Sequence, residues 1–375
     1  MYPPLVPISS EALVSGDTPV HFGDLIIAEE NDSKYQKSLG EVAYDLNSRK
    51  VAWRTSEIFY GHESAVVGNH LIYFNGKHQI AVINPAGQEQ SRTELPLSVP
   101  EQALGHLIST SVQVVGEVFI LPMHSTLLAY RIDDLLSSEL PAQPLWRFDV
   151  KALSSTGIAR FPSLSCAVQE QACYVIESKG SPEQQQASTE VVKLDALTGQ
   201  ENWRKTLFAT QAGDTPHLGV VQSGRGSIVV HVQGTSVVTA YTQSGTELWK
   251  NTSILCPGGA TNILSHLIVR DDVVVVSPLG DRCYTALEAS TGATRFVFSP
   301  PLGGSFGQVP SFVNGVMYAT NGFLWAVDTE DGSILGRSTT ELPYAQGKTG
   351  TVIFDAPRQQ LLVWGGKLSA FRPVR

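Results

Sequence analysis

The sequence predicts an all-β fold: a single β-propeller domain spanning residues 1–375, with seven or eight four-stranded blades. Three observations lead to this prediction. A β-hairpin pattern returns along the chain, a second pair of short strands precedes each hairpin, and no stretch has the apolar periodicity of an amphipathic helix. Hairpins recur at a spacing of roughly 40 to 55 residues, which suits a propeller blade.

The repeated hairpin is clearest in VVKLDALTGQENW at 191–203. Related copies are VVTAYTQSGTELW at 237–249, YTALEASTGATRF at 284–296 and LWAVDTEDGSILG at 324–336. Each copy is a strand of alternating apolar residues, a tight turn with Gly beside Thr, Ser or Asp, and a second strand that usually ends on Trp or Phe. We interpret these hairpins as the two outer strands of successive blades.

The number of blades follows from the ends of the outer strands. Seven such ends occur, near Trp53, Arg92, Trp146, Trp203, Trp249, Phe296 and Gly336. The tail KTGTVIFDAPRQQLLVWGGKLSAF supplies three further strands, and the N-terminal segment LVPISSEALV can supply the missing fourth. Pairing the two ends of the chain would close the ring without an open edge, so we prefer eight blades and keep seven as the alternative. The recurring tryptophans are expected to pack between neighbouring blades.

The charge and hydropathy of the sequence limit the partners that the protein can bind. The net charge is −9, and no Lys/Arg cluster indicates nucleic acid or an anionic membrane surface. No apolar run reaches the length of a spanning helix, so no membrane span is expected.

Cysteines and sequons indicate a secreted protein whose signal peptide has been removed. Cys166 and Cys173 flank a short turn and are expected to form a disulfide, and Cys256 with Cys283 is a second plausible pair. Glycosylation sequons begin at Asn31 and Asn251. The alternative is a cytosolic protein with four buried, unpaired thiols.

The segment ALTGQENW and its relatives resemble the repeat of the PQQ-like propellers, and the resemblance covers nearly the whole chain. The quinoprotein dehydrogenases of that superfamily carry adjacent cysteines beside the quinone and a calcium ion held by acidic and amide side chains. This chain has no adjacent cysteine pair, no CxxCH haem motif and no acidic run with calcium-loop spacing. We therefore expect no quinone or other cofactor. No metal site is expected either, since no histidine pair has the local spacing of a ligand set.

Ligand chemistry in a propeller usually lies on the face that carries the loops leading into each innermost strand. The residues just before the predicted innermost strands are polar, aromatic and rich in imidazole. They include His21, His62, His106, Arg160, Phe161, His217, Asn262, Phe306, Gln308, Gln346 and Lys348, with Tyr344 and Trp364 as further lining candidates. Turns with a purely structural role would favour Gly, Asn, Asp and Ser, so this composition predicts a pocket for small apolar or aromatic substrates.

The general character of the sequence resembles the fungal hetero-Diels–Alderases of tropolone–sesquiterpenoid biosynthesis. That resemblance implies a cofactor-free pericyclase that joins a tropolone-derived quinone methide to a humulene-type terpene. His62, His106 and His217 are then the acid–base candidates, and Arg160 or Lys348 would stabilise negative charge on the tropolone oxygen. The remaining predicted residues would bind substrate, with Phe161, Phe306 and Trp364 as the apolar wall.

The alternative function is a non-catalytic scaffold that binds another protein, as a resemblance to the bacterial outer-membrane assembly factor would imply. The sequence leaves the oligomeric state open. It also leaves open which histidine is essential.

Overall fold

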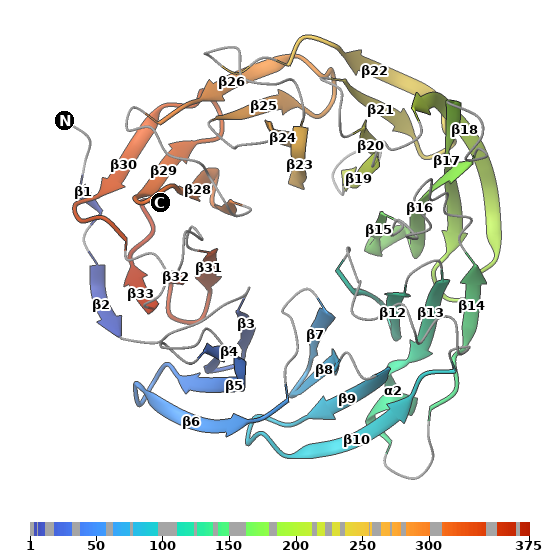
Figure 1. The fold of residues 1–375 in the computed structure, drawn as a ribbon. Helices are drawn as coiled ribbons and strands as arrows, with labels where there is room; N and C mark the ends of the chain where they lie inside the picture. The colour runs from blue at the N-terminus through green and yellow to red at the C-terminus, as the bar shows by residue number, and fades with distance from the viewer. Residues whose placement is uncertain are drawn as a thin grey trace.

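The computed structural model shows a ring of β-sheets (Figure 1). The structure describes residues 4–5, 7–11, 19–31, 38–57, 63–75, 78–96, 111–123, 126–137, 142–149, 163–179, 186–211, 216–221, 227–232, 237–254, 256, 264–270, 272–278, 283–300, 310–342, 351–364 and 368–375. Within these residues the strands form eight sheets. Six of them consist of four consecutive strands, and each of the other two includes one strand from the N-terminal segment. The predicted all-β propeller is confirmed, and eight sheets lie within the predicted range.

The sheets are numbered here as blades 1 to 8 in chain order, and the strands of a blade as first to fourth from the centre of the ring outward. Blade 1 contains β3 (Val20–Phe22), β4 (Leu25–Asn31), β5 (Ser38–Asp45) and β6 (Lys50–Thr55), and blade 2 contains β7 (Ser64–Val67), β8 (His70–Phe74), β9 (Gln79–Ile83) and β10 (Glu89–Glu94). Blade 3 contains β11 (Gln113–Val115), β12 (Val118–Met123), β13 (Thr126–Arg131) and β14 (Trp146–Asp149), and blade 4 contains β15 (Leu164–Ala167), β16 (Ala172–Lys179), β17 (Gln186–Asp195) and β18 (Glu201–Gln211).

Blade 5 contains β19 (Pro216–Val221), β20 (Ser227–Val232), β21 (Val238–Thr242) and β22 (Glu247–Asn251), and blade 6 contains β23 (Leu264–Arg270), β24 (Val273–Pro278), β25 (Tyr284–Glu288) and β26 (Thr294–Phe298). Blade 7 contains β27 (Ser311–Val313), β28 (Val316–Thr320), β29 (Leu324–Asp328) and β30 (Ile334–Ser338), and blade 8 contains β31 (Thr351–Asp355), β32 (Gln360–Trp364), β33 (Leu368–Phe371) and β2 (Pro7–Glu11). Two short helices, α2 (Ile132–Leu136) and η2 (Val168–Glu170), and the strand β1 (Pro4–Leu5) complete the described elements.

The two ends of the chain close the ring, as predicted. β2 pairs antiparallel with β33, with Pro7 opposite Phe371 and Glu11 opposite Leu368. The preceding strand β1 pairs in parallel with β30, so the N-terminal segment lies along the outer edges of blades 7 and 8 (Figure 1). Leu5 is buried among residues of both blades. The edge strand of blade 8 is therefore provided by the opposite end of the chain.

The second and third strands of each blade form the core because neighbouring blades cover both of their faces. β28 and β29 are buried at every position, which explains why their sequences VMYAT and LWAVD are almost continuously apolar. Fourth strands have solvent on one side and alternate instead, as in KVAWRT of β6.

Aromatic residues of the fourth strands join neighbouring blades, which confirms their predicted structural role. At four junctions the ring of this residue lies against a glycine in the turn between the third and fourth strands of the next blade. The pairs are Trp53 on Gly87, Trp146 on Gly199, Trp249 on Gly292 and Phe296 on Gly332. The three indole Nε1 atoms donate to backbone carbonyls of the same turns, at 2.8 to 3.1 Å. The repeated Gly thus leaves room for the ring of the preceding blade.

Two of the other four junctions are filled by different side chains. Arg92 takes the tryptophan position in blade 2, and the next blade carries α2 and a longer connection where the glycine turn would be. Ile132 and Leu135 of α2 fill that junction. Between blades 4 and 5, Trp203 packs with Tyr174 while Lys205 lies against Gly245.

Both predicted disulfides are present. Cys166 and Cys173 face each other across β15 and β16. Cys256, in the segment after β22, is bonded to Cys283, the residue before β25. Disulfides persist in oxidising compartments, so the two bridges are consistent with a secretory or extracellular environment. In the described ranges, no helix is sufficiently long and apolar to cross a membrane.

Candidate functional site

The alternation of strand direction gives the ring two different faces. The connections between second and third strands, and those that enter each first strand, lie on one face, called here the upper face. The turns between first and second and between third and fourth strands lie on the lower face. The predicted site was assigned to the connections of the upper face.

Buried polar side chains gather toward the upper face in every blade. Of the sixteen polar or charged residues that are buried in the described part of the chain, eleven lie on second or third strands, or directly beside them, in the half next to the upper face. They are Glu41, Asn75, Thr126, Glu177, Glu190, Thr239, Ser277, Thr285, Thr320, Asn321 and Ser369. Of the same sixteen residues, only Asp328 and Asp355 lie at strand ends next to the lower face. Since buried polar groups need polar partners, the upper face is the chemically specialised end of the ring.

Among these eleven residues, the buried carboxylates belong to the first half of the ring, blades 1 to 4. Glu41, Glu177 and Glu190 belong to blades 1 and 4, whereas blades 5 to 8 contribute hydroxyl and amide groups. In blade 4, Glu177 lies directly opposite Glu190, and Arg204 on β18 bridges both carboxylates. The guanidinium compensates two like charges that would otherwise repel each other at this separation.

Blade 2 holds the most extensive described cluster near the upper face. The Tyr73 hydroxyl donates to Glu57 at 2.8 Å, and Arg92 Nη2 donates to the same carboxylate at 2.9 Å. Arg92 Nη1 donates to Gln79, whose amide in turn donates to Glu94. Burial, reinforced by Glu57, raises the pKa of the Tyr73 hydroxyl well above its usual range. Tyr73 is therefore a neutral hydrogen-bond donor that holds Glu57 in place.

This cluster exists because blade 2 lacks the usual tryptophan. Arg92 lies opposite Ala81, as Trp53 lies opposite Ala43 in blade 1. Helix α2 fills the junction that the indole would fill, so the guanidinium is available to Glu57 and Glu89. The hydrogen bond to Glu89 is the main cause of a raised pKa of Arg92, and the contacts with Glu57 add to it.

Most predicted site residues lie outside the described residues. These are His62, His106, Arg160, Phe161, Asn262, Phe306, Gln308, Tyr344, Gln346 and Lys348. Of the predicted site, the structure describes His217, Trp364 and His21.

His217 lies on β19, the innermost strand of blade 5, one residue from the point where that strand begins. It is half-buried, and its Nε2 atom is shielded from solvent. The ladder places His231 of β20 directly opposite. His231 was not among the predicted residues, although its separation of fourteen residues from His217 within one predicted strand pair would have indicated it.

Trp364 ends β32 near the upper face but is almost entirely buried. It packs with Ile26 and Ala28 of blade 1, at the junction that closes the ring. Its indole Nε1 is buried and makes no hydrogen bond to a described residue.

His78 is a second residue that the sequence analysis missed. It lies in the connection between β8 and β9 with φ of 63°, in the left-handed region that non-glycine residues rarely adopt. Its Nδ1 atom is buried without a hydrogen-bond partner among the described residues. In the sequence NGKHQ it is indistinguishable from an ordinary turn residue.

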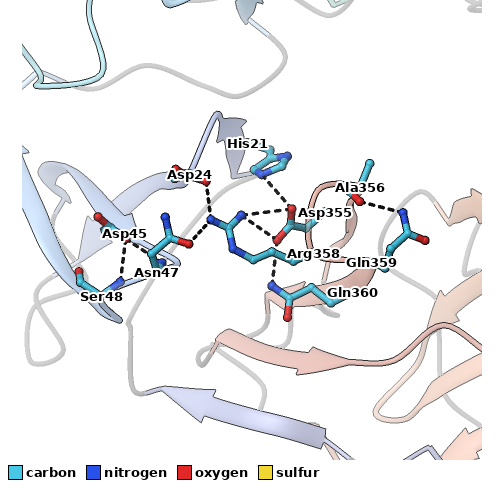
Figure 2. A network of polar contacts seen from close by, with 10 residues as sticks. All are labelled: His21, Asp24, Asp45, Asn47, Ser48, Asp355, Ala356, Arg358, Gln359 and Gln360. Atoms are coloured by element: carbon cyan, nitrogen blue, oxygen red, sulfur yellow. Dashed lines mark hydrogen bonds and ion pairs between the residues drawn. The ribbon is translucent and has the colours of Figure 1, made fainter.

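His21 belongs to a polar cluster near the lower face, rather than to the entry position predicted for it (Figure 2). It lies within β3, with its Nε2 atom 3.7 Å from Oδ1 of the fully buried Asp355. Arg358 donates to Asp355 at 3.2 Å and also contacts Asp24 and Asn47 of blade 1. The cluster joins the first blade to the last, so we assign it a structural role.

The Asn251 sequon carries its asparagine at the end of β22. Nδ2 of Asn251 donates to Gly292 O of blade 6 at 2.7 Å, and Oδ1 accepts from Ser253 N at 2.8 Å. The side chain thus ties two blades together through the nitrogen that a glycan would occupy. Asn31 lies at the end of β4. Among the described residues, no group of three or more His, Cys, Asp or Glu side chains could hold a metal ion.

Comparison of solved structures shows the same fold in proteins of different function. The crystal structure of BamB from Moraxella catarrhalis has a TM-score of 0.65 and 13% identity, covering 98% of this chain and 100% of that chain. A europium-containing methanol dehydrogenase has a TM-score of 0.65 and 10% identity, covering 98% and 93%. Sqt1 of Saccharomyces cerevisiae has a TM-score of 0.58 and 11% identity, covering 99% of each chain. These similarities establish the fold only.

At the level of sequence, no curated protein matches this chain. Residues 188–373 match a family model of PQQ-like repeats described as outer membrane protein assembly factor BamB. The matched segment contains the four clearest hairpin repeats and the last three strands of the ring. Over residues 188–373, this chain is therefore similar in sequence to the PQQ-like repeats of that family.

Proposed function

We propose that this protein is a cofactor-free pericyclase, a hetero-Diels–Alderase that joins a tropolone-derived quinone methide to a humulene-type terpene at the upper face of the ring. The observation that carries the proposal is the position of His217. An imidazole on an innermost strand, shielded from solvent at Nε2, is suited to proton transfer near neutral pH. The polar residues beneath the upper face in all eight blades support the choice of that face.

The first proposed step is loss of water from a hydroxymethyl tropolone. A general acid protonates the departing hydroxyl group, its C–O bond breaks, and a base removes the proton of the ring hydroxyl. The products are water and the quinone methide, with no change of oxidation state. His217 is one acid–base candidate, together with His62 and His106. Arg160 or Lys348 would stabilise the developing charge on the tropolone oxygen.

The second proposed step is a cycloaddition in which the quinone methide and the alkene form one C–C and one C–O bond in a dihydropyran. This step requires no acid or base. Holding both partners in one orientation can contribute roughly 7 to 11 kcal/mol in favourable cases. Phe161, Phe306 and Trp364 are the proposed apolar wall, with Asn262, Gln308, Tyr344 and Gln346 as polar contacts.

The test is incubation of the purified, metal-stripped protein with a hydroxymethyl tropolone and a humulene-type alkene, followed by chiral chromatography against a control without protein. We expect faster and stereoselective adduct formation. His217→Ala should lower turnover at least tenfold without lowering the melting temperature. His70→Ala, at the lower-face start of β8, is the matched control and should retain full activity. Equal turnover in the two variants would remove the role assigned to His217.

A second candidate, a protein-binding scaffold, is favoured by the family match over residues 188–373. The matched family is named for an assembly factor, and the fold of BamB covers 98% of this chain. A rate and product mixture identical to the control without protein would favour this second function.

A further inference from the structure

His78 differs from the other described non-glycine residues that have a left-handed backbone. Five such residues occur in the described part of the chain: Arg49, His78, Gln171, Asn314 and Gln359. Four of them are exposed and lie in hairpin turns of the lower face, where a left-handed residue helps to close the turn. Of the five, His78 alone is half-buried and lies in an upper-face connection, between β8 and β9. Its backbone strain therefore falls on the face of the proposed site.

The backbone around His78 is fixed on both sides. The carbonyl of His78 accepts a hydrogen bond from Leu95 N at 2.9 Å, and the carbonyl of the next residue, Gln79, accepts one from Asn75 N at 3.1 Å. The side-chain oxygen of Gln79 also accepts from Nδ2 of Asn75 at 2.9 Å and from Nη1 of Arg92 at 2.7 Å. These contacts hold the strained conformation in place, as the surroundings of a strained residue must.

The imidazole of His78 has a buried nitrogen that serves no structural hydrogen bond. Its Nδ1 atom is buried and has no partner among the described residues. An N–H group at Nδ1 would need an acceptor there, so we assign the proton of the neutral ring to Nε2. Since the side chain is only half-buried, the Nε2–H group is a donor of fixed tautomer that a bound molecule can use.

The turn itself does not require a histidine. Strain and a buried nitrogen without a partner both cost stability, and glycine would remove both costs. Blade 7 shows that solution, because Gly322 in the corresponding connection between β28 and β29 has φ of 99°. The histidine of blade 2 is thus better explained by a role of its side chain than by the geometry of the turn.

We propose that His78 is a substrate-binding residue of the proposed pericyclase, and that its Nε2–H group donates a hydrogen bond to an oxygen of the tropolone ring. This inference rests on the proposed function. A tropolone carries a carbonyl oxygen beside a hydroxyl oxygen, and both accept hydrogen bonds. Negative charge develops on the ring oxygen during the loss of water, so a fixed donor stabilises the transition state more than the bound substrate.

Three variants separate this role from a structural one. His78→Gly and His78→Ala both remove the donor, and each should lower turnover at least tenfold in the assay with a hydroxymethyl tropolone and a humulene-type alkene. Only glycine relieves the left-handed backbone, so His78→Gly should melt about 1 to 3 °C higher than His78→Ala. His78→Gln keeps an N–H donor at the end of the side chain and should keep turnover within threefold of the unmodified protein.

The matched control is Arg49, an exposed residue with φ of 54° in a lower-face turn of blade 1. Arg49→Gly should also melt higher than Arg49→Ala, and both variants should keep full turnover.

Two results would overturn the role of His78 in an active protein. One is turnover that follows the melting temperature, with His78→Gly more active than His78→Gln. The other is full turnover in His78→Ala. If the unmodified protein forms no adduct above the control without protein, the proposed function itself is wrong, and the role of His78 falls with it.

Discussion

At the scale of single residues, the junctions between blades depend on pairs of one aromatic residue and one glycine. Gly199 has φ of 70°, and a Cβ atom built on it would lie 2.6 Å from Cδ2 of Trp146. The indole Nε1 of Trp146 also donates to Ala196 O at 3.1 Å. The glycine therefore serves two purposes, since the turn needs a left-handed residue and the indole needs the space.

Gly199→Ala should destabilise the protein more than Gly116→Ala. Both glycines have positive φ, and the left-handed conformation costs an alanine about 1 to 2 kcal/mol at either site. Only at Gly199 does the new methyl group collide with a ring, which adds about 1 to 3 kcal/mol of overpacking. Thermal unfolding of the two variants measures the difference. Equal melting temperatures would show that the indole moves away without cost.

The glycine and tryptophan positions were predictable because each recurs once per repeat. His78 was not predictable, since nothing in NGKHQ distinguishes a strained histidine with a buried nitrogen from a solvated one. The same holds for Arg92. Its sequence position marked an outer-strand end, but its partners Glu57 and Gln79 lie on other strands and connections.

At the scale of elements, the two disulfides constrain the chain differently. Cys166–Cys173 joins adjacent strands of one sheet and closes 7 residues, whereas Cys256–Cys283 closes 27 residues and ties the entry segment of blade 6 to its third strand. In the chain-entropy model, a longer closed loop removes more freedom from the unfolded state.

Replacing Cys256 and Cys283 by Ser should therefore cost more stability than replacing Cys166 and Cys173. The chain-entropy relation gives a loss in the free energy of unfolding of roughly 3.5 kcal/mol for the first pair and roughly 2.4 kcal/mol for the second. Denaturant unfolding of the two double variants measures both values. The reverse order would show that packing of the buried Cys166 and Cys173 side chains outweighs the entropy of the longer loop.

The conformation of the blade 4 hairpin depends on its neighbours in the sheet. Residues 179–191 are rich in Gln and Ser and are predicted to form a hydrophilic flap. The structure instead includes Gln186–Val191 in β17, paired with β16 and β18. Its neighbours in the sheet decide its conformation, because β-propensity depends strongly on cross-strand packing.

At the scale of the whole molecule, closure of the ring is a contact between residues at opposite ends of the chain. β2 completes blade 8, and Arg358 connects the first turn of that blade to Asp24 and Asn47 of blade 1, 334 and 311 residues away in sequence (Figure 2). The C-terminal Arg375 forms a further ion pair with Asp328 of blade 7 at 2.7 Å.

The polar cluster around Arg358, which joins blade 8 to blade 1, should make the stability of the protein depend on pH in the acid range. The hydrogen bond from Arg358 lowers the pKa of Asp24 below the ordinary aspartate value of 3.8. A lowered folded-state pKa contributes stability that is present above pH 3.8 and is lost as the pH falls through the folded-state value. Asp24→Asn should therefore lower the melting temperature at pH 6 and have little effect near pH 2.

Thermal unfolding between pH 2 and pH 7 checks this expectation. Asp134→Asn, on the exposed side of α2, is the control and should follow the unmodified protein. A difference between Asp24→Asn and the unmodified protein that stays constant across this range would argue against a role for the Asp24 charge.

The sequence by itself determined the propeller: the strands, their grouping in fours, the aromatic positions, the disulfide pairs and the use of the N-terminal segment to close the ring. These features are local or repeated, and period-two alternation and turn residues encode them directly. The sequence also indicated His217, because an imidazole before an innermost strand departs from ordinary turn composition.

Only the tertiary structure decided which residues meet. The ring of buried polar groups, the Tyr73–Glu57–Arg92 cluster, the burial of Trp364 between blades 8 and 1 and the position of His21 beside Asp355 all join residues from different strands or blades. Such contacts depend on how the repeats pack around the closed ring. No periodicity within one repeat specifies that arrangement, since the same repeat packs against a helix, a lysine or an indole at different junctions.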